Sequence, residues 1–507
     1  MAKPIDLAEL FGALPTAPGA LEEREPLTTI RGANLLIDML AEAGVEVVFG
    51  LPGGAISPVH DALLDSKLRV VTTRHESGAM FAAAGYSRAT GKLSVVAVTT
   101  GPGVLNAMTG LASAWCDGLP VLLLVGEVPR LAQGKGVLQD GSAHGLHIVD
   151  MARHITKLSA EVARPSMLPH LARRAIATAL SGRRGPVLLT LPMDVTTAQI
   201  ARPRSGGGVQ LASLVDPELL DEVAGLLRDS QRPLILVGNG ARSDGAPKHL
   251  QAVAELVACP VATTPKGKGA FPESHPLALG VLGLGGHRSA QRYLEAGVDV
   301  VIAIGTSLGD LATDGFSPHL QAPWALVHVD IDSRQIGKSY APTHAIVASA
   351  SEFLAGLAER LAVRPDRQGP ARAAPLRALP GGVERVVLPS SRRFDRIASQ
   401  DALTEIQEVL PGDTIYSIDS GEHFLFAAHY LATDLPDAFV AMTGLGSMGQ
   451  SIGATIGAQL AFPERTVAAI CGDGCFAMNA FEVATAVAER LPIRVFVFND
   501  QRLGMVE

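Results

Sequence analysis

The chain has 507 residues, a length that exceeds one hydrophobic core and favours about three domains. Hydrophobic residues make up 47% of the chain and charged residues 18%, which is typical of globular proteins and excludes a disordered one. The formal net charge of −8 gives no electrostatic reason to expect nucleic acid or an anionic membrane as a partner.

The start of the chain lacks a charged region followed by an apolar one, so we expect no secretion signal. No apolar run is long enough to cross a bilayer. The cysteines are Cys116, Cys259, Cys471 and Cys475. They are too few for a disulfide framework, and no further histidine or cysteine clusters near the last two to form a zinc site. These features predict a cytoplasmic protein whose cysteines are buried free thiols.

A first block of alternating helices and strands occupies residues 27–200. The segment "ANLLIDMLAEAG" has helical spacing and ends on Gly44, a residue suited to the left-handed turn after a helix. The strands expected after it are "VEVVFG", "SVVAVTT", "PVLLLVG" and "GPVLLTLP". Continuously apolar strands that alternate with helices predict a parallel sheet covered by helices on both faces.

The same alternation occurs twice more along the chain. A linker, "ARPRSGGGVQ", is expected at residues 201–210, and a longer proline-rich breaker at residues 364–382. The second block, residues 211–363, contains "PLILVGNG", "CPVATT", "VDVVIAIG" and "ALVHVDID". The third block, residues 384–507, contains "DTIYSIDSG", "DAFVAMTGLGSMG", "TVAAICGDG" and "IRVFVFND". We therefore predict an α/β protein with three successive parallel-sheet α/β domains.

Two strands of the third block end on residues with oxygen donors. "TVAAICGDG" ends with Asp473 between Gly472 and Gly474, and "IRVFVFND", one helix later, ends just after Asn499. Because ligands bind beyond the carboxyl ends of parallel strands, neighbouring strands would bring both side chains to one rim. Oxygen donors suit Mg²⁺, the glycines let the backbone approach a ligand, and a following helix N-terminus favours an anion. Two ordinary strand–turn junctions are the less favoured alternative.

This GDG turn, followed by a later asparagine, resembles the signature of thiamine diphosphate (ThDP) enzymes. Four further segments resemble acetolactate synthase large subunits and their relatives, in the same order along the chain. They are "FGLPGGAISPVHDAL", "RHESGAMFAAAGYSRATGK", "TTGPGVLNAMTGLASAWCDGLPVLLLVGEVP" and "GLGSMGQSIGATIGAQLA". The resemblance implies a pyrimidine-binding domain at residues 27–200, a central Rossmann-like domain at 211–363 and a diphosphate-binding domain at 384–507.

The resemblance assigns the metal and the diphosphate to the third block. Asp473 and Asn499 are implied as Mg²⁺ ligands, together with the backbone carbonyl of Gln501. Gly472, Gly474 and Gln501 are implied to contact the cofactor.

Glu76 is the main candidate catalytic residue. Taken alone, it is an ordinary acid in the first turn of a helix, where its negative charge interacts favourably with the helix dipole. In the family motif it matches the glutamate that bonds N1′ of the cofactor's aminopyrimidine and so promotes loss of the thiazolium C2 proton. Met448 matches the residue over which the two cofactor rings fold, with core packing as the alternative. Backbone groups of Gly446 and Met448 are implied to bond the pyrimidine edge.

Two glycine-rich turns of the first block carry further implied cofactor contacts. Gly101, Pro102 and Asn106 match the pyrimidine-side loop, and Gly53 matches the substrate-side turn. As isolated turns they would mean little. In the relatives the glutamate comes from one subunit and the GDG site from another. The resemblance therefore implies a homodimer or homotetramer, with small-residue helix faces at the interface.

The implied reaction is that of a ThDP- and Mg²⁺-dependent carboligase, which decarboxylates a 2-keto acid, pyruvate first of all, and transfers the two-carbon unit to a second carbonyl. Gln139 is a candidate catalytic residue on the substrate side. It lies in "LQD", where Leu138 replaces a usual phenylalanine, and Glu127 replaces a usual glutamine. A 2-keto acid decarboxylase, or an acyloin-forming carboligase with another acceptor, therefore stays open. A flavin-dependent pyruvate oxidase and an inactive scaffold subunit are less favoured.

The second block resembles an FAD-binding middle domain in "PKGKGAFPESHPLALGVLGLGGH" and "HVDIDSRQIGK". The usual arginine-rich stretch after "AIG" is replaced by "TSLGD" at residues 306–310, whereas Arg242 in "VGNGAR" keeps part of a nucleotide site. FAD binding is therefore open. The family continues beyond "NDQRLGMVE", so the third domain is expected to be incomplete at its C-terminus. The resemblance also allows a regulatory small subunit as partner and a role in branched-chain amino acid biosynthesis.

Overall fold

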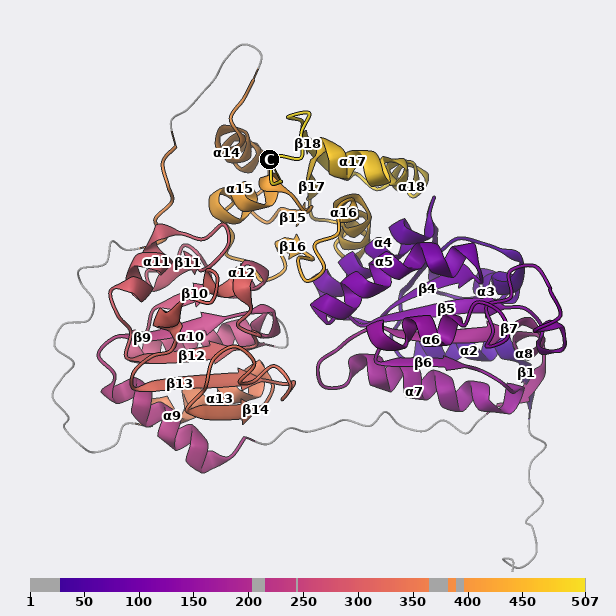
Figure 1. The fold of residues 1–507 in the computed structure, drawn as a ribbon, viewed down its shortest axis with the longest axis horizontal. Helices are drawn as coiled ribbons and strands as arrows, with labels where there is room; N and C mark the ends of the chain where they lie inside the picture. The colour runs from indigo at the N-terminus through magenta and orange to yellow at the C-terminus, as the bar shows by residue number, and fades with distance from the viewer. Residues whose placement is uncertain (1–27, 203–214, 243–244, 364–381, 389–395, 507) are drawn as a thin grey trace, which may run out of the picture.

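The computed structural model contains three α/β domains that follow one another along the chain. It describes residues 28–202, 215–242, 245–363, 382–388 and 396–506 (Figure 1). Each domain has a parallel sheet with helices packed on it, which confirms the predicted fold class. The third domain lies above the other two in Figure 1. Most of the expected linker at 201–210 and of the breaker at 364–382 lies outside the described residues.

The first domain is built on a six-stranded sheet. Its strand order is β3 (Arg69–Thr72), β2 (Val47–Gly50), β4 (Ser94–Thr99), β5 (Val121–Glu127), β7 (Val187–Pro192) and β6 (Leu158–Glu161). Its helices are α2 (Gly32–Glu42), α3 (Ser57–Leu64), α4 (Glu76–Thr90), α5 (Pro102–Asp117), α6 (Ile148–Ala152), α7 (Leu168–Leu180) and α8 (Met193–Thr196). An antiparallel pair joins β1 (Thr29–Arg31) to β8 (Gln199–Ala201). Gly44, after α2, has φ 80°, as predicted.

The second domain also has six parallel strands. Their order is β11 (Ala278–Val281), β10 (Val261–Thr263), β9 (Pro233–Val237), β12 (Val300–Ile304), β13 (Ala325–Asp330) and β14 (His344–Val347). Its helices are α9 (Pro217–Asp229), α10 (Ala246–Val257), α11 (Arg288–Glu295), α12 (Asp310–Thr313) and α13 (Ala350–Ala362).

The third domain has a sheet of four parallel strands. Their order is β16 (Phe439–Ala441), β15 (Ile415–Ile418), β17 (Val467–Gly472) and β18 (Arg494–Phe498). Its helices are α14 (Ser399–Val409), α15 (Glu422–Tyr430), α16 (Gln450–Ala461), α17 (Asp473–Asn479) and α18 (Val483–Ala488).

The single helix predicted between β17 and β18 is wrong. The structure has α17 and α18, separated by a 3₁₀ turn over Ala480–Glu482. The turn directs the fully buried Glu482 side chain toward the first domain, where it accepts hydrogen bonds from the backbone N–H groups of Arg74 and His75. The helix expected here is therefore interrupted at Glu482, whose side chain bonds to the backbone just before α4.

The apolar strands form the core because each presents side chains to two helical layers. In β4, Val96 and Val98 belong to the core on one face, whereas Val95 and Ala97 belong to the core on the other. All four are fully buried. Alternate side chains of a strand point to opposite faces, so a continuously apolar strand fits a sheet covered on both sides. Within the described residues, no helix combines the length and the apolarity that a membrane span requires.

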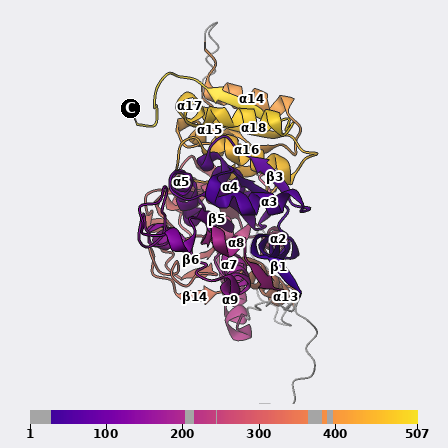
Figure 2. The ribbon, with the colours of Figure 1, turned by 90° about the vertical axis from the view of Figure 1, so that its right-hand side faces the viewer.

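Helices α4 and α16 hold the first and third domains together (Figure 2). A Cβ added to Gly457 would lie 2.0 Å from the backbone oxygen of Ala82, and one added to Gly85 would lie 2.4 Å from the Cα of Ala454. The two backbones are therefore in direct contact, which only glycine permits. The small-residue face of α4, including Ala83, is buried inside one chain. It is therefore not free to form the subunit interface that we had expected of small-residue helix faces.

A pair of histidines joins the second and third domains. The His287 and His429 rings stack with centroids 4.8 Å apart. Nδ1 of His287 accepts from the N–H of Val281, so its Nε2 donates to the carbonyl of His429. Nε2 of His429 accepts from the N–H of Val386, so its Nδ1 donates to the carbonyl of Gly286. Each ring is thus held in one neutral tautomer, and a second proton would displace a backbone donor.

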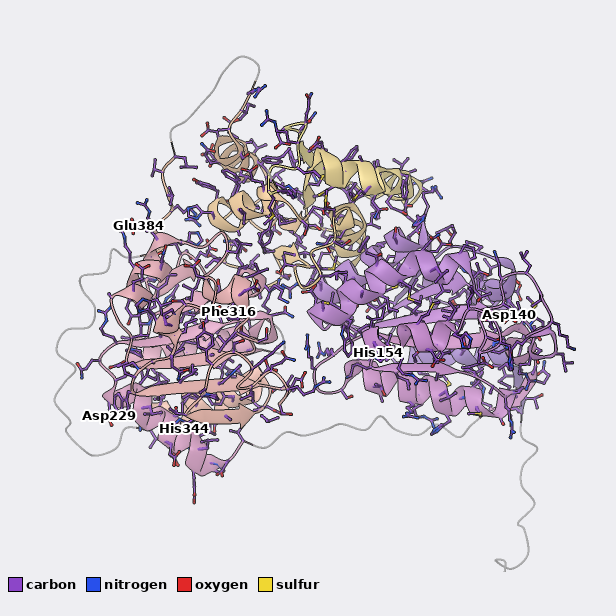
Figure 3. All side chains as sticks on the ribbon, viewed as in Figure 1. Asp140, His154, Asp229, Phe316, His344 and Glu384 are labelled. Carbon is purple, nitrogen blue, oxygen red and sulfur yellow. The ribbon has the colours of Figure 1, made fainter. Side chains whose placement is uncertain are left out.

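The charges around this pair also oppose protonation. Burial, followed by the positive charges of Lys268 and Arg385, lowers the pKa of His287 to about 2. Burial also lowers the pKa of His429. The carboxylate of Glu273 pairs with both cations, which keeps the charges balanced without making the histidines more basic. Glu384, on the segment beside this cluster, lies at the edge of the second domain nearest the third (Figure 3).

We predict that this pair makes the fold sensitive to acid. An unfolded histidine has a pKa of about 6.5, so the unfolded chain gains a proton below that pH while folded His287 stays neutral. The contribution of His287 to the free energy of unfolding is fully present above the unfolded pKa, and it is lost as the pH falls below that value. Between about pH 7.5 and about pH 5.5 the loss through His287 should be ~1.4 kcal/mol.

Urea unfolding at these two pH values measures the effect. His287→Gln should lower stability at neutral pH but shrink its pH dependence by the stated amount. The exposed His154 provides the matched control, His154→Gln. An equal pH dependence in wild type and His287→Gln would contradict the prediction.

Candidate active site

The first group of predicted residues lies at the carboxyl edge of the first sheet. We call this group the N-terminal half-site; it comprises Gly53, Glu76, Gly101, Pro102, Asn106 and Gln139. These residues follow β2, β3, β4 and β5, whose parallel alignment brings their ends to one edge. The structure therefore brings together all the site residues predicted for the first domain.

Glu76 is held in a fixed orientation at the start of α4. Its side chain is buried, and its Oε2 accepts a hydrogen bond of 3.0 Å from Nδ2 of Asn106 on α5. Gly103 leaves room for the other oxygen, since a Cβ there would lie 3.3 Å from Oε1. Gly53 packs on Thr99, with a virtual Cβ 2.6 Å from that side chain's Cβ. The sequence motifs thus form a close-packed wall around one carboxylate.

Gln139 lies directly on the turn that follows β4. A Cβ added to Gly101 would be 3.0 Å from the Cβ of Gln139. Gly101 has φ 67° and ψ −119°, a conformation open to glycine alone. Gln139 itself has φ 61° and is exposed, and Leu138 is 82% exposed. Asp140 follows at the rim of the domain remote from the second domain (Figure 3).

The second group lies at the carboxyl edge of the third sheet. We call it the C-terminal half-site; it comprises Gly446, Met448, Gly472, Asp473, Gly474, Asn499 and Gln501. Strands β17 and β18 pair in parallel with Gly472 opposite Phe498, so Asp473 and Asn499 are the next residues of adjacent strands. The strand-end argument from the sequence required this adjacency.

The turn containing Met448 packs onto the GDG turn. A Cβ on Gly474 would lie 3.1 Å from Cε of Met448. Gly446 has φ 69° and packs near the Ser420 hydroxyl. Gln501 has φ 61° and donates its N–H to Oδ1 of Asn499. The predicted residues of the third domain therefore also form one cluster.

Asp419 is a residue of this site that sequence reasoning missed. It follows β15 and is buried, and its two carboxylate oxygens accept hydrogen bonds of 2.9 Å from the N–H groups of Gly449 and Ser451. These are the amides at the start of α16. A carboxylate at a helix N-terminus is favoured by the helix dipole, and here it fixes the turn that carries Met448. Its position after a strand was a signal that could have identified it.

His423 is the second missed residue. It lies in the first turn of α15, and Gly472 packs against its ring, with a virtual Cβ 3.2 Å from Nδ1. Its Nε2 is buried and has no hydrogen-bond partner among the described residues. Burial lowers the pKa of His423, against the opposing charge of Asp419. A buried nitrogen without a partner is a group that a bound ligand could satisfy.

The cysteines beside this half-site are buried free thiols, as predicted. Burial raises the pKa of Cys471 and of Cys475 to about 12, so neither is a thiolate at neutral pH. Cys259 is buried as well, whereas Cys116 is only half-buried. Within the described part of the chain, no three His, Cys, Asp or Glu side chains converge on a complete metal site. Asp473 and Asn499 would therefore need further oxygen ligands to hold a metal, such as those of a diphosphate.

The two half-sites lie at the edges of different sheets. Among the described residues, no hydrogen bond or ion pair joins Glu76 to Met448, Asp473 or Asn499. Glu482 adds to the α4–α16 contact between these domains by bonding to the residues just before Glu76.

A cleft of about 2070 Å³ lies between the first and second domains. Its wall includes Asp117, which pairs with Lys266 at 3.2 Å, and Arg88, which donates to the Lys266 carbonyl. Nε and Nη1 of Arg242 are buried without a partner among the described residues. Burial and the Arg88 charge lower the pKa of Arg242, so an anion in the cleft would be stabilised.

Three family models of the thiamine pyrophosphate (ThDP) enzymes match the chain. They describe the N-terminal TPP-binding domain at residues 30–146, the central domain at 220–357 and the C-terminal TPP-binding domain at 419–507. The chain therefore belongs to the thiamine pyrophosphate enzyme family, as an acetolactate synthase-like, ThDP-dependent carboligase.

Its relatives include acetolactate synthases from all three domains of life. A probable acetolactate synthase large subunit of Methanocaldococcus jannaschii is 36% identical over 94% of this chain and 81% of the relative. An acetolactate synthase of Arthrospira platensis is 34% identical over 96% of this chain and 84% of the relative. The chloroplastic acetolactate synthase 2 of Nicotiana tabacum is 35% identical over 94% of this chain and 71% of the relative.

Proposed function

We propose that the protein uses ThDP and Mg²⁺ to decarboxylate pyruvate and to join the two-carbon unit to a second carbonyl. With pyruvate as both donor and acceptor the product is 2-acetolactate. The observation that carries this proposal is the pair of half-sites at two sheet edges. One presents a buried, oriented carboxylate, and the other presents two oxygen donors beside a histidine whose Nε2 has no partner among the described residues.

The residues of the C-terminal half-site fit the diphosphate end of the cofactor. Asp473 and Asn499 would hold Mg²⁺ through their side-chain oxygens, joined by the carbonyl of Gln501. Nε2 of His423 would meet a diphosphate oxygen, and the glycines around Asp473 allow the backbone to approach.

The residues of the N-terminal half-site fit the reactive end. When bound, ThDP supplies a carbon nucleophile and an electron sink for decarboxylation. Glu76 would bond a nitrogen of the pyrimidine ring and hold a proton there. Asn106 keeps the Glu76 carboxylate in one orientation by donating to Oε2. Gln139, which is exposed beside Gly101, would bind the substrate.

We further propose that two copies of the chain complete each active site. The motivation is that no hydrogen bond or ion pair joins Glu76 to Asp473 among the described residues of one chain, while both half-sites lie at sheet edges. A second copy could present its C-terminal half-site to the first copy's N-terminal half-site. We thus propose a homodimer or a homotetramer. We also propose that it is cytoplasmic and that a regulatory small subunit is among its partners.

FAD is a second candidate ligand, and the cleft beside Arg242 favours it. Two unpartnered guanidinium nitrogens and ample volume fit an anionic dinucleotide, although residues 306–310 contribute Asp310 where arginines are usual. The visible spectrum of the purified protein checks this directly. Flavin absorbance that bleaches when pyruvate is added would indicate a flavin-dependent pyruvate oxidase.

We predict 2-acetolactate and CO₂ as the products from pyruvate with ThDP and Mg²⁺. Assays with added 2-ketobutyrate or an aldehyde test the acceptor, because the exposed Leu138 replaces a larger residue. Acetaldehyde as the main product would contradict carboligation and favour a decarboxylase. Cofactor binding without any turnover would favour a scaffold subunit.

We predict that Glu76→Gln slows exchange of the C2 proton of bound ThDP by about 10²–10⁴-fold, because the amide cannot hold the shared proton. Binding of the cofactor should survive, since the C-terminal half-site is intact. Exchange is measured by NMR in deuterated buffer.

Asp473→Ala is the matched contrast for this experiment. It should abolish the rise in melting temperature that ThDP with Mg²⁺ produces in wild type, because a ligand must bind the native state to stabilise it. Unchanged proton exchange in Glu76→Gln would remove Glu76 from the mechanism.

A further inference from the structure

Glu127 is a fully buried carboxylate at the end of β5. It accepts three hydrogen bonds. Oε1 accepts from the N–H groups of Val128 at 2.8 Å and Gly141 at 3.1 Å, and Oε2 accepts from the Thr100 hydroxyl at 3.0 Å. No ion pair involves Glu127 in the part of the chain that the structure describes. This acid is therefore stabilised by neutral donors alone.

The three donors belong to separate segments that meet at the N-terminal half-site. Thr100 directly precedes Gly101, and Gly141 lies two residues after Gln139. A Cβ added to Gly141 would be 2.2 Å from the Thr100 hydroxyl and 2.5 Å from Oε2 of Glu127. The turn at 138–141 is thus pressed against the turn after β4, with the carboxylate between them.

This contact bears directly on the backbone of Gln139. A left-handed conformation is strained for a residue with a side chain, and such strain persists only where the surroundings impose it. Asp140 holds the outer side of the turn by accepting from the N–H groups of Gly134 and Ser142. Glu127 holds the inner side, which faces Gly101.

The hydrogen-bonding groups of the Glu127 side chain are suited to holding the two turns together. Burial raises the pKa of Glu127, and its hydrogen bonds partly offset this cost. A glutamine side chain could still accept from both amides, while its NH₂ group would require the Thr100 hydroxyl to turn and accept. An alanine would leave the amide of Gly141 without a partner, at a cost typical of a buried unsatisfied donor.

We propose that Glu127 is a positioning residue that holds Gln139 over Gly101 and so determines which second carbonyl the enzyme accepts. This rests on the proposed function, in which Gln139 binds substrate. Glu127 acts through the 138–141 turn and touches neither cofactor nor substrate. Its effect is therefore on the acceptor step and not on activation of the cofactor.

The test compares Glu127→Ala with Glu127→Gln, and uses Glu408→Gln, at an exposed site on α14, as the matched control. Amide exchange of Gly141 in the free protein should accelerate about tenfold in the alanine variant and stay within about threefold of wild type in the glutamine variant. With pyruvate and 2-ketobutyrate in competition, the alanine variant should raise the acceptor KM about tenfold and shift the product ratio. Exchange of the ThDP C2 proton should not change.

Retention of the wild-type acceptor KM by Glu127→Gln, alongside its loss in Glu127→Ala, supports the proposal. An alanine variant with faster Gly141 exchange but an unchanged acceptor KM and product ratio would overturn it. So would an equal fall in proton exchange and carboligation, which would indicate a general structural role.

Two arms keep the test decisive. If Glu127→Ala fails to fold, Gly141→Ala forces the same two turns apart while Glu127 is retained, and an unchanged product ratio there overturns the proposal. If wild type forms no carboligation product, the proposed function fails, whereas Gly141 exchange still shows whether Glu127 holds the turn.

Discussion

The contact between the backbones of α4 and α16 is the constraint on which the arrangement of both half-sites depends. Glycines at positions 85 and 457 allow this approach, because any Cβ would overlap the opposite helix. α4 begins at Glu76, and α16 begins just after the turn that carries Met448. The helix contact therefore fixes how Glu76 of one domain stands relative to the carboxyl edge of the third sheet within the chain. The Glu482 side chain adds a second tie at the start of α4.

Both half-sites lie at the carboxyl edge of a parallel sheet. Parallel strands end at a common edge, where turns can carry polar residues without breaking the core. The buried carboxylates there have different tasks. Asn106 orients Glu76, whereas Asp419 and Glu127 accept hydrogen bonds that hold turns in place. Gln139 and Asn499, which we propose to contact ligands, are exposed and lie next to these buried supports.

The sequence predicted the three α/β domains and the clusters around Glu76 and Asp473, because apolar strands and strand-end residues are local patterns. It did not predict the supports. Glu482 bonds to the backbone of Arg74 across 408 positions in the chain, and Asp419 reaches Gly449 only after β15 and α16 are assembled. No local pattern encodes such partners. The contact of the small-residue face of α4 with α16 was not predicted for the same reason, since α16 lies far away in sequence.

In the proposed dimer, Glu76 of one subunit acts on a cofactor anchored by Asp473 of the other. Mixing Glu76→Gln protomers with Asp473→Ala protomers, after dissociation and reassembly, tests it directly. Each variant alone should be nearly inactive, and random reassembly into dimers should restore about one quarter of wild-type activity through one intact site per mixed dimer. A mixture as inactive as its two components, with mixed dimers present, would contradict the claim.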